Sequence, residues 1–307
     1  MAKKHRLFLS MYTFQIKRRN TSNLDVIDNN AFLSKAYPDV EDKFAQGFVQ
    51  DIIKLFDLKL FKNKEETHGG ILEESDFNSG NRTFDLMLNG GLKGLKQYLI
   101  NENGDKKDIS EKEIVGLKFF ARIWLPANTS TGYIFIQRYN DISLKTLFDE
   151  IIYEVLYKHK FILAGQRTVK TTTKVRQKEF LKKAGVQEIT VAVYNSPHDT
   201  GAPNATSATI RLKDIAFKKN KISKEDVDSE LKKKGIEVNT AYTYQTKYKA
   251  EIDGYSEEKT IKENNTLDLI PNILISSDCI DDNNHPIFKK MQSFVMAEME
   301  QIKQEAK

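Results

Sequence analysis

The first strand-like segment of the chain is apolar on both of its faces, and this limits where it can lie. Between Arg6 and Arg18 the hydrophobic side chains alternate, with Leu7, Leu9 and Met11 pointing one way and Phe8, Tyr12, Phe14 and Ile16 mostly the other. Such a strand is usually internal to a sheet or covered on both sides, because an exposed face would leave one row of these side chains in water. We therefore expect this strand to lie inside a covered sheet.

Helices are predicted where apolar residues recur at helical spacing. Tyr37-Pro38-Asp39 is expected to open the first helix, which continues to about Leu60, because proline and an acid suit the first turn. Further helices are predicted at 144–156, 175–184, 223–234 and 286–302, with one or two helical turns at 92–99. Ser223 and Asp226 have the spacing of a capping pair at the start of their helix.

Strands are predicted where β-branched and aromatic residues lie between turn signals. The predicted ranges are 82–88, 114–125, 133–139, 161–169, 188–194, 208–217, 236–252, 255–261 and 272–276. The segments 114–139 and 236–261 read as hairpins, the second over Asp253-Gly254. The polar segments 21–35 and 62–80 are predicted to be loops. Gly90-Gly91 is predicted to be a plain turn that resembles a phosphate loop only superficially.

The order of these elements is similar in the two halves of the chain, although no residue-level repeat is found. A chain of 307 residues is long enough for one large domain or two of ordinary size. We predict an α+β fold of two mixed α/β modules, 1–157 and 158–307, each with an antiparallel-rich sheet and helices on one face. A split βαβ layout of the ferredoxin-like kind, common among RNA-binding modules, fits each half loosely.

Composition narrows the class of protein. Eighteen Phe and twelve Tyr argue against disorder, and no apolar run is long enough to cross a bilayer. The basic N-terminus lacks the apolar region of a signal peptide. Cys279 is the only cysteine, which excludes an internal disulfide and a cysteine-based zinc cluster. These features predict a cytoplasmic protein without a membrane partner. The abundance of Lys and Asn is typical of AT-rich bacterial or phage genomes.

Residues 158–183 carry the most uneven charge in the chain. They hold nine Lys/Arg and one acid, Glu179, whereas the whole chain has a formal charge of only +5. Such an imbalance predicts a polyanion-binding surface, with nucleic acid, RNA or DNA, as the ligand class. The candidate phosphate-binding residues are Lys158, Lys160, Arg167, Lys170, Lys174, Arg176, Lys178, Lys182 and Lys183, together with Arg18 and Arg19 near the N-terminus. The alternative is a solvated surface whose lysines maintain solubility.

A second candidate feature is the segment Tyr242 to Lys249. On a strand, Tyr242, Tyr244 and Tyr248 share one face, while the cations Lys247 and Lys249 share the other. Rings near cations on a sheet surface can stack unpaired bases, each worth roughly 1–3 kcal/mol. The alternative is a tyrosine stripe that packs against a helix.

Two groups of acids could hold a divalent metal for phosphodiester cleavage. The first is Asp253 with Glu257 and Glu258, and the second comprises Asp278, Asp281, Asp282 and His285. Hairpin-tip acids and a turn before the last helix explain both groups at least as well. His198-Asp199 lies on an extended loop, where adjacent side chains point apart, and acids near Cys279 would raise the pKa of its thiol. No catalytic residue, cofactor or metal ligand is therefore predicted.

The sequence favours a cytoplasmic nucleic-acid-binding protein that contacts mainly phosphates, with base stacking in addition. A role in phage defence or in a mobile element is compatible with its composition. The first alternative is a metal-dependent nuclease or toxin, so the question of enzymatic activity stays open. The second is an adaptor subunit of a multiprotein complex, which would dock a partner through its methionine-rich last helix.

Overall fold

The computed structural model describes residues 6–22, 24–57, 60–93, 97–110, 112–165, 167–194, 206–213, 222–237, 242–252, 255–263, 265 and 269–306. The chain divides into two compact units. Unit 1 comprises Met1–Thr171 and Ile273–Gln304, and unit 2 comprises Thr172–Asn272 with Glu305–Lys307. Both units combine helices with antiparallel sheets, which confirms the predicted α+β class. The division differs from a single boundary near residue 157, because the chain returns to unit 1 at Ile273.

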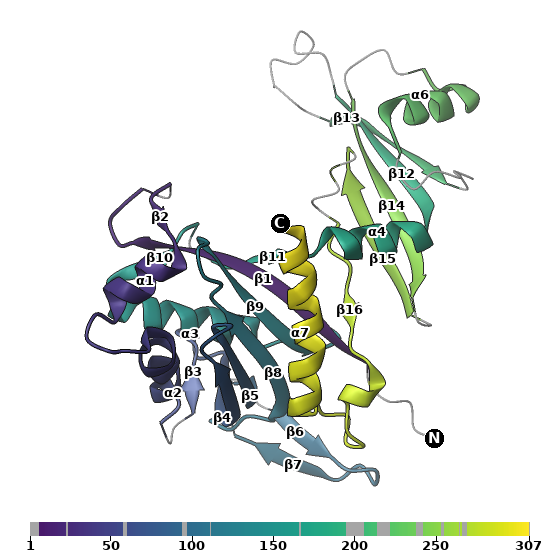
Figure 1. The fold of residues 1–307 in the computed structure, drawn as a ribbon. Helices are drawn as coiled ribbons and strands as arrows, with labels where there is room; N and C mark the ends of the chain where they lie inside the picture. The colour runs from purple at the N-terminus through teal and green to yellow at the C-terminus, as the bar shows by residue number, and fades with distance from the viewer. Residues whose placement is uncertain are drawn as a thin grey trace. The chain divides into compact units, whose positions relative to one another are not determined.

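The sheet of unit 1 is built on β1 (Leu7–Arg18), as Figure 1 shows. β9 (Thr131–Tyr139) pairs along one edge of β1 and is followed there by β2 (Val26–Ile27). The other edge pairs in succession with β16 (Ile273–Leu274), β11 (Val169–Thr171) and β10 (Phe161–Leu163). Beyond β9 the sheet continues through β8 (Leu117–Trp124), β5 (Thr83–Leu92), β4 (His68–Asn78) and β3 (Phe61–Lys62). β1 therefore lies inside the sheet, as its two apolar faces predict.

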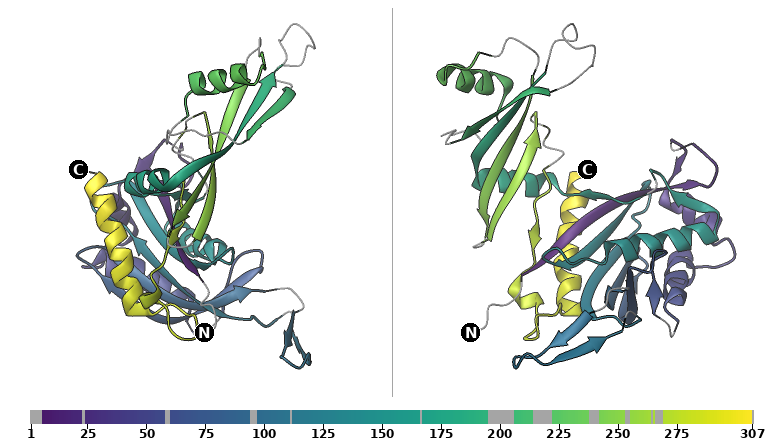
Figure 2. Two further views of the ribbon diagram at one scale, coloured as in Figure 1. Left: turned by 90° about the vertical axis from the view of Figure 1, so that its right-hand side faces the viewer. Right: turned by 180° about the vertical axis from the view of Figure 1, so that it is seen from behind.

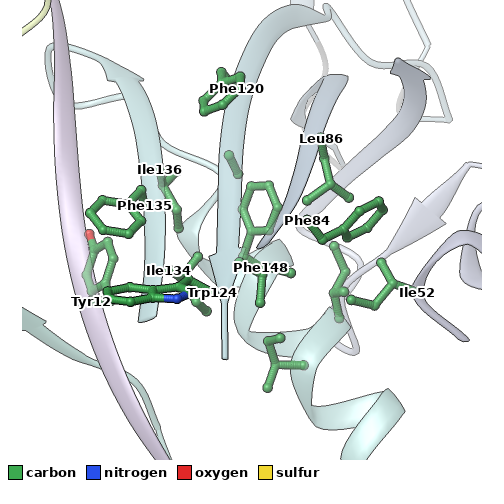
Figure 3. Packing of buried hydrophobic residues seen from close by; sticks show 14 of the residues in the cluster. Tyr12, Ile52, Phe84, Leu86, Phe120, Trp124, Ile134, Phe135, Ile136 and Phe148 are labelled. Carbon is green, nitrogen blue, oxygen red and sulfur yellow. The ribbon is translucent and has the colours of Figure 1, made fainter. Parts of the chain in front are cut away.

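Helices cover both faces of this sheet, whereas the prediction placed them on one face only. α3 (Lys145–Lys158) lies on one face and α7 (Phe288–Glu305) on the other (Figures 1 and 2). Phe120 of β8 meets Phe288 of α7 with ring centroids 5.7 Å apart. Figure 3 shows Phe84 and Phe148 among the side chains that fill the core on the α3 side. α2 (Gln50–Leu55) and the π-helical turn η1 (Lys43–Val49), which precedes it, join the same core.

Several segments predicted to be loops or turns have regular structure. Residues 21–35 contain most of α1 (Asn29–Ala36), and residues 62–80 contain β4. Residues 97–99, expected to be helical as part of 92–99, lie in β6 (Gln97–Ile100), which pairs with β7 (Lys106–Ile109). The first predicted helix begins at Lys43 rather than at Pro38. Asp42 caps it, because its carboxylate accepts hydrogen bonds from the backbone amides of Phe44 and Ala45.

The glycine pair Gly90-Gly91 is part of β5 and not a turn. It faces Gly69 and Gly70 of β4 across the ladder. A Cβ atom on Gly90 would lie 2.5 Å from the carbonyl oxygen of Gly69, so only glycine allows this close approach of the two backbones. The predicted turn is therefore corrected to a continuous strand.

Unit 2 is a four-stranded antiparallel sheet with two helices (Figure 2). Its strands are β12 (Ala184–Tyr194), β13 (Thr206–Lys213), β14 (Tyr242–Ile252) and β15 (Tyr255–Lys262), in the order β13-β12-β14-β15. β13 and β14 both run antiparallel to β12 and hence parallel to each other. Since α6 (Lys224–Lys233) lies between them in the chain, they form a split βαβ arrangement around β12. The Ser223–Asp226 capping box predicted for α6 is present.

The last helix, α7, is an integral part of unit 1. Its apolar residues Met291, Val295 and Met299 are fully buried in the core. The most buried part of this face therefore packs on the chain itself, while Phe294 and Met296 are only partly buried. Docking of a protein partner through this helix stays a prediction. Among the described residues, no helix has both the length and the hydropathy that crossing a membrane requires.

Candidate nucleic-acid interface

The basic stretch 158–183 is divided between the two units. Its first part ends α3 and continues as β10 and β11, which run along one edge of β1 in unit 1. Its second part forms α4 (Lys174–Lys183), whose Phe180 is fully buried in the core of unit 2. The cations predicted to share one surface thus belong to two separate sets, and each is described within its own unit.

In unit 1 the N-terminal arginines lie beside the start of the basic stretch. Arg18 pairs with Phe161 in the β1–β10 ladder, and the backbone amide of Arg19 donates to the carbonyl oxygen of Lys160 at 3.0 Å. The side chains of Arg18, Arg19, Lys158 and Lys160 are all exposed. Strand pairing therefore brings together cations that are about 140 residues apart in the sequence.

Two exposed tyrosines on the outer side of α3 adjoin these cations. The rings of Tyr153 and Tyr157 are stacked, with centroids 5.4 Å apart and planes inclined by 25°. The guanidinium carbon of Arg19 lies 4.6 Å from the centroid of the Tyr157 ring. Their exposed fractions, 37% and 40%, leave aromatic surface in contact with solvent. We call Arg18, Arg19, Lys158, Lys160, Tyr153 and Tyr157 the β1–α3 cluster.

The two tyrosines were missed by the sequence prediction. They lie outside the apolar stripe that identifies α3. A signal was nevertheless present, because residues four apart on a helix lie on the same face, and two tyrosines at that spacing are able to meet.

A buried carboxylate anchors the cluster to the core. Asp51 of α2 lies 2.6 Å from the Lys158 ammonium and 2.7 Å from Nε2 of His159, and it accepts a hydrogen bond from the Tyr37 hydroxyl at 3.1 Å. Burial acts to raise the pKa of Asp51, but hydrogen bonds from Lys158, His159 and Tyr37 outweigh it and lower that pKa. Burial, with Asp51 beside it, raises the pKa of Tyr37. The charge of Lys158 is thus partly neutralised, whereas Arg18 and Lys160 form no ion pair with any described residue.

The other cations of the basic stretch are distributed as follows. Arg167 is exposed, and Lys170 is half-buried in β11 opposite Tyr12 of β1. On α4, Lys174, Lys178 and Lys182 recur every fourth residue and form an exposed row, with Lys183 exposed beside it. Arg176 is 3.2 Å from Glu179 in an ion pair. α4 therefore presents a row of lysines to solvent, which fits phosphate contact and a solvated surface equally well.

The stacking prediction for the β14 tyrosines is corrected by the structure. Tyr244 and Tyr248 are 7% and 2% exposed and belong to the core of unit 2. The Tyr244 hydroxyl donates to the carbonyl oxygen of Ile222 at 3.2 Å, and desolvation raises the pKa of both tyrosines. Tyr242 is half-buried, and its hydroxyl donates to Asp228 on α6. Because α6 covers this face of the sheet, Tyr244 and Tyr248 have no face on which a base could stack.

The acids considered for metal binding have structural roles. Glu257 is 3% exposed, pairs with Lys259 at 3.0 Å and accepts from the backbone amide of Asn272. Glu258 pairs with Lys247 at 2.5 Å. Within the described parts of the chain, no three His, Cys, Asp or Glu side chains are grouped as metal ligands. Asp253 and His198-Asp199 lie outside the described residues.

The segment before α7 forms a turn, as the alternative interpretation of its acids predicts. Asp281 accepts from the backbone amides of Asn283 and His285, and Nδ1 of His285 is 3.0 Å from the Tyr139 hydroxyl. Cys279 is buried, and burial, with Asp278 nearby, raises the pKa of its thiol. A reactive thiolate is not expected in such surroundings.

The chain was compared with protein-family models, with curated proteins and with solved structures, and none of the three comparisons found a match. Any assignment of function therefore rests on the geometry described above.

Proposed function

We propose that the chain is a cytoplasmic nucleic-acid-binding protein that holds a single strand on the β1–α3 cluster. The observation that carries this proposal is the convergence of Arg18 and Arg19 with Lys160 beside the exposed, stacked rings of Tyr153 and Tyr157. Cations that follow a backbone, together with aromatic rings on which bases stack, are the two components of single-strand binding sites.

Each part of the cluster has a distinct role in this proposal. Arg18, Arg19 and Lys160 contact phosphates and release the counterions condensed on them. Arg19 lies over the Tyr157 ring, which keeps its planar guanidinium oriented and leaves N–H donors for a phosphate. Tyr153, at the other side of the stacked pair, offers its ring to an unpaired base. Base stacking tolerates any base, so we expect weak sequence preference.

The test is a fluorescence-anisotropy titration of a labelled single-stranded oligonucleotide at 50 and 200 mM salt. The variant carries Arg18→Gln, Arg19→Gln and Lys160→Gln, which removes three cations. Because log K for a single strand falls by about 0.7 per phosphate contact for each decade of salt, its salt slope should be less steep than that of the wild type by about 2. The affinity at 50 mM salt should fall in parallel.

A matched control neutralises three exposed lysines elsewhere in unit 1. Lys106, Lys107 and Lys112, on and beside the β6–β7 hairpin, are all exposed, and their change to glutamine alters the net charge by the same amount. The control should bind as the wild type does. Equal losses in both variants would show a diffuse charge effect and overturn the proposed site, and absence of binding at 50 mM salt would overturn the function.

A further inference from the structure

The sheet of unit 2 is covered by helices on one face only. α4 and α6 contribute Phe180, Val227 and Leu231 to the core that contains Tyr244 and Tyr248 of β14. Side chains alternate along each strand, so the residues between those tyrosines point to the other face. No described element of unit 2 packs an apolar group on that face, which we call the open face.

One row of the open face crosses all four strands without an acid. Lys262 of β15 pairs with Gln245 of β14, Gln245 with Thr190 of β12, and Thr190 with Arg211 of β13. The row thus has a cation at each end and two neutral polar residues between them. Three strand spacings separate the ends, so the backbones of Arg211 and Lys262 lie about 14 Å apart.

The end cations of this row are not neutralised. Arg211 and Lys262 are exposed and form no ion pair with any described residue. Two other cations of the face are paired, since Lys247 is 2.5 Å from Glu258 and Lys213 is 3.8 Å from Glu188. Glu258 and Glu188 therefore neutralise Lys247 and Lys213 beside the row. The row from Arg211 to Lys262 keeps its positive charge.

The surface along this row is hollow. A depression of about 420 Å³ is lined by residues that include Thr190, Gln245 and Lys262, and by one acid, Glu263. Thr190 donates to Glu188 at 3.1 Å, which leaves the Gln245 amide as the neutral donor of the row. The face carries no exposed aromatic ring or large aliphatic side chain among its described residues, so its chemistry suits an extended polyanion and not an apolar ligand.

We propose that the open face of the unit 2 sheet is a second binding surface, specific for the phosphate backbone of a nucleic acid. A strand crosses the sheet along the row, with phosphates at Arg211 and Lys262 and a hydrogen bond from Gln245. The contacts proposed for this surface are to the phosphate backbone, since its described side chains include no exposed aromatic ring. The choice of ligand rests on the proposed function, and the two surfaces together make the protein bivalent toward a long strand.

The experiment compares three variants of the full chain in anisotropy titrations with a long single strand. The first carries Arg211→Gln and Lys262→Gln. The second is the Arg18, Arg19 and Lys160 triple variant, and the third combines all five changes. A control neutralises Lys232 and Lys234, which are exposed at the end of α6 and beyond it. Thermal unfolding monitored by circular dichroism verifies that each variant is folded.

We expect the first variant to reduce the salt slope by about 1.4, from two lost contacts at about 0.7 each, and the α6 control to leave it unchanged. The combined variant should bind more weakly than either parent. If the first variant matches the wild type while the triple variant loses binding, the open-face proposal falls and the β1–α3 cluster stands. If only the first variant loses binding, the β1–α3 cluster falls instead. Equal competition by polyglutamate would overturn the choice of a phosphate ligand.

Discussion

Replacement of Asp51 by asparagine should weaken the fold and strengthen nucleic-acid binding in the same molecule. Asp51 holds Lys158, His159 and Tyr37 through contacts of 2.6, 2.7 and 3.1 Å. An asparagine of the same shape has one oxygen acceptor instead of a carboxylate, so at least one of the three donors loses its partner. At the same time the ammonium of Lys158 loses the charge that neutralises it.

The cost in stability follows from burial. A hydrogen bond to a charged group contributes about 1.5–3 kcal/mol, and breaking a fully buried ion pair costs about 3–5 kcal/mol. The Asp51 side chain is 8% exposed, but that of Lys158 is 56% exposed, so solvent screening reduces the Lys158 contribution. We therefore expect the free energy of unfolding to fall by about 2 kcal/mol, measured by urea denaturation at pH 7.

The gain in binding follows from the released charge. One additional cation in the β1–α3 cluster steepens the salt slope by about 0.7, which increases the ratio of affinities at 50 and 200 mM salt about 2.5-fold. The control is Glu102→Gln, which removes an exposed acid from the β6–β7 connection without a buried partner. The reasoning is refuted if Asp51→Asn leaves both stability and salt slope unchanged, or if Glu102→Gln produces the same gain.

Three further outcomes are expected. The pKa of Asp51 is lowered in the folded state, so its contribution to stability is complete above the unfolded carboxyl pKa of about 4 and is lost as the pH falls through the folded value. The difference between wild type and Asp51→Asn in urea denaturation should thus shrink from pH 6 to pH 2.5, and a constant difference would contradict this sign. Tyr153→Ala should cost about 1–3 kcal/mol of binding at fixed salt in the anisotropy assay, because it removes the ring on which a base stacks, whereas Tyr153→Phe should bind as the wild type does. Arg122 and Asp85 form a buried ion pair at 2.6 Å, so Arg122→Met should lower the free energy of unfolding by about 3–5 kcal/mol. Adding Asp85→Leu should restore most of the lost stability, because no unpaired charge then stays buried. No recovery would show that packing, not charge, dominates.

Part of this fold could be predicted from sequence because some patterns are local. The double-sided apolar alternation of β1 identifies an internal strand, and Ser223 with Asp226 identifies the start of α6. β4 was missed because most of its residues are half-exposed or exposed, so no apolar face distinguishes it from a charged loop. Gly90 and Gly91 of β5 are needed because the carbonyl oxygens of Gly69 and Val115 approach them closely, and a single segment contains no information about such neighbours.

The candidate interface was predicted only in part, for a related reason. Charge counting identifies Arg18, Arg19 and Lys160, but their proximity depends on the register of β1 and β10, which are separated by most of unit 1. The alternation of side chains along a strand correctly predicts that Tyr244 and Tyr248 share one face of β14. It does not indicate that this is the face that the helices cover. A role in phosphate binding stays a prediction for all the cations of the basic stretch. The titrations above test Lys160, which the fold brings together with Arg18 and Arg19.

The edge of β1 also shows how unit 2 is inserted into the chain. Thr171, the last residue of β11, stands opposite Met11, and Ile273, the first of β16, stands opposite Leu9. Only Ser10 lies between these two positions of β1. β11 and β16 therefore occupy the two parts of what would be one uninterrupted strand, and unit 2 is inserted between them in the sequence. Joining Thr172 directly to Ile273 would leave one residue opposite Ser10 and close the gap without slack. Such a shortened protein would lack unit 2 and its open face, and would keep unit 1 with the β1–α3 cluster.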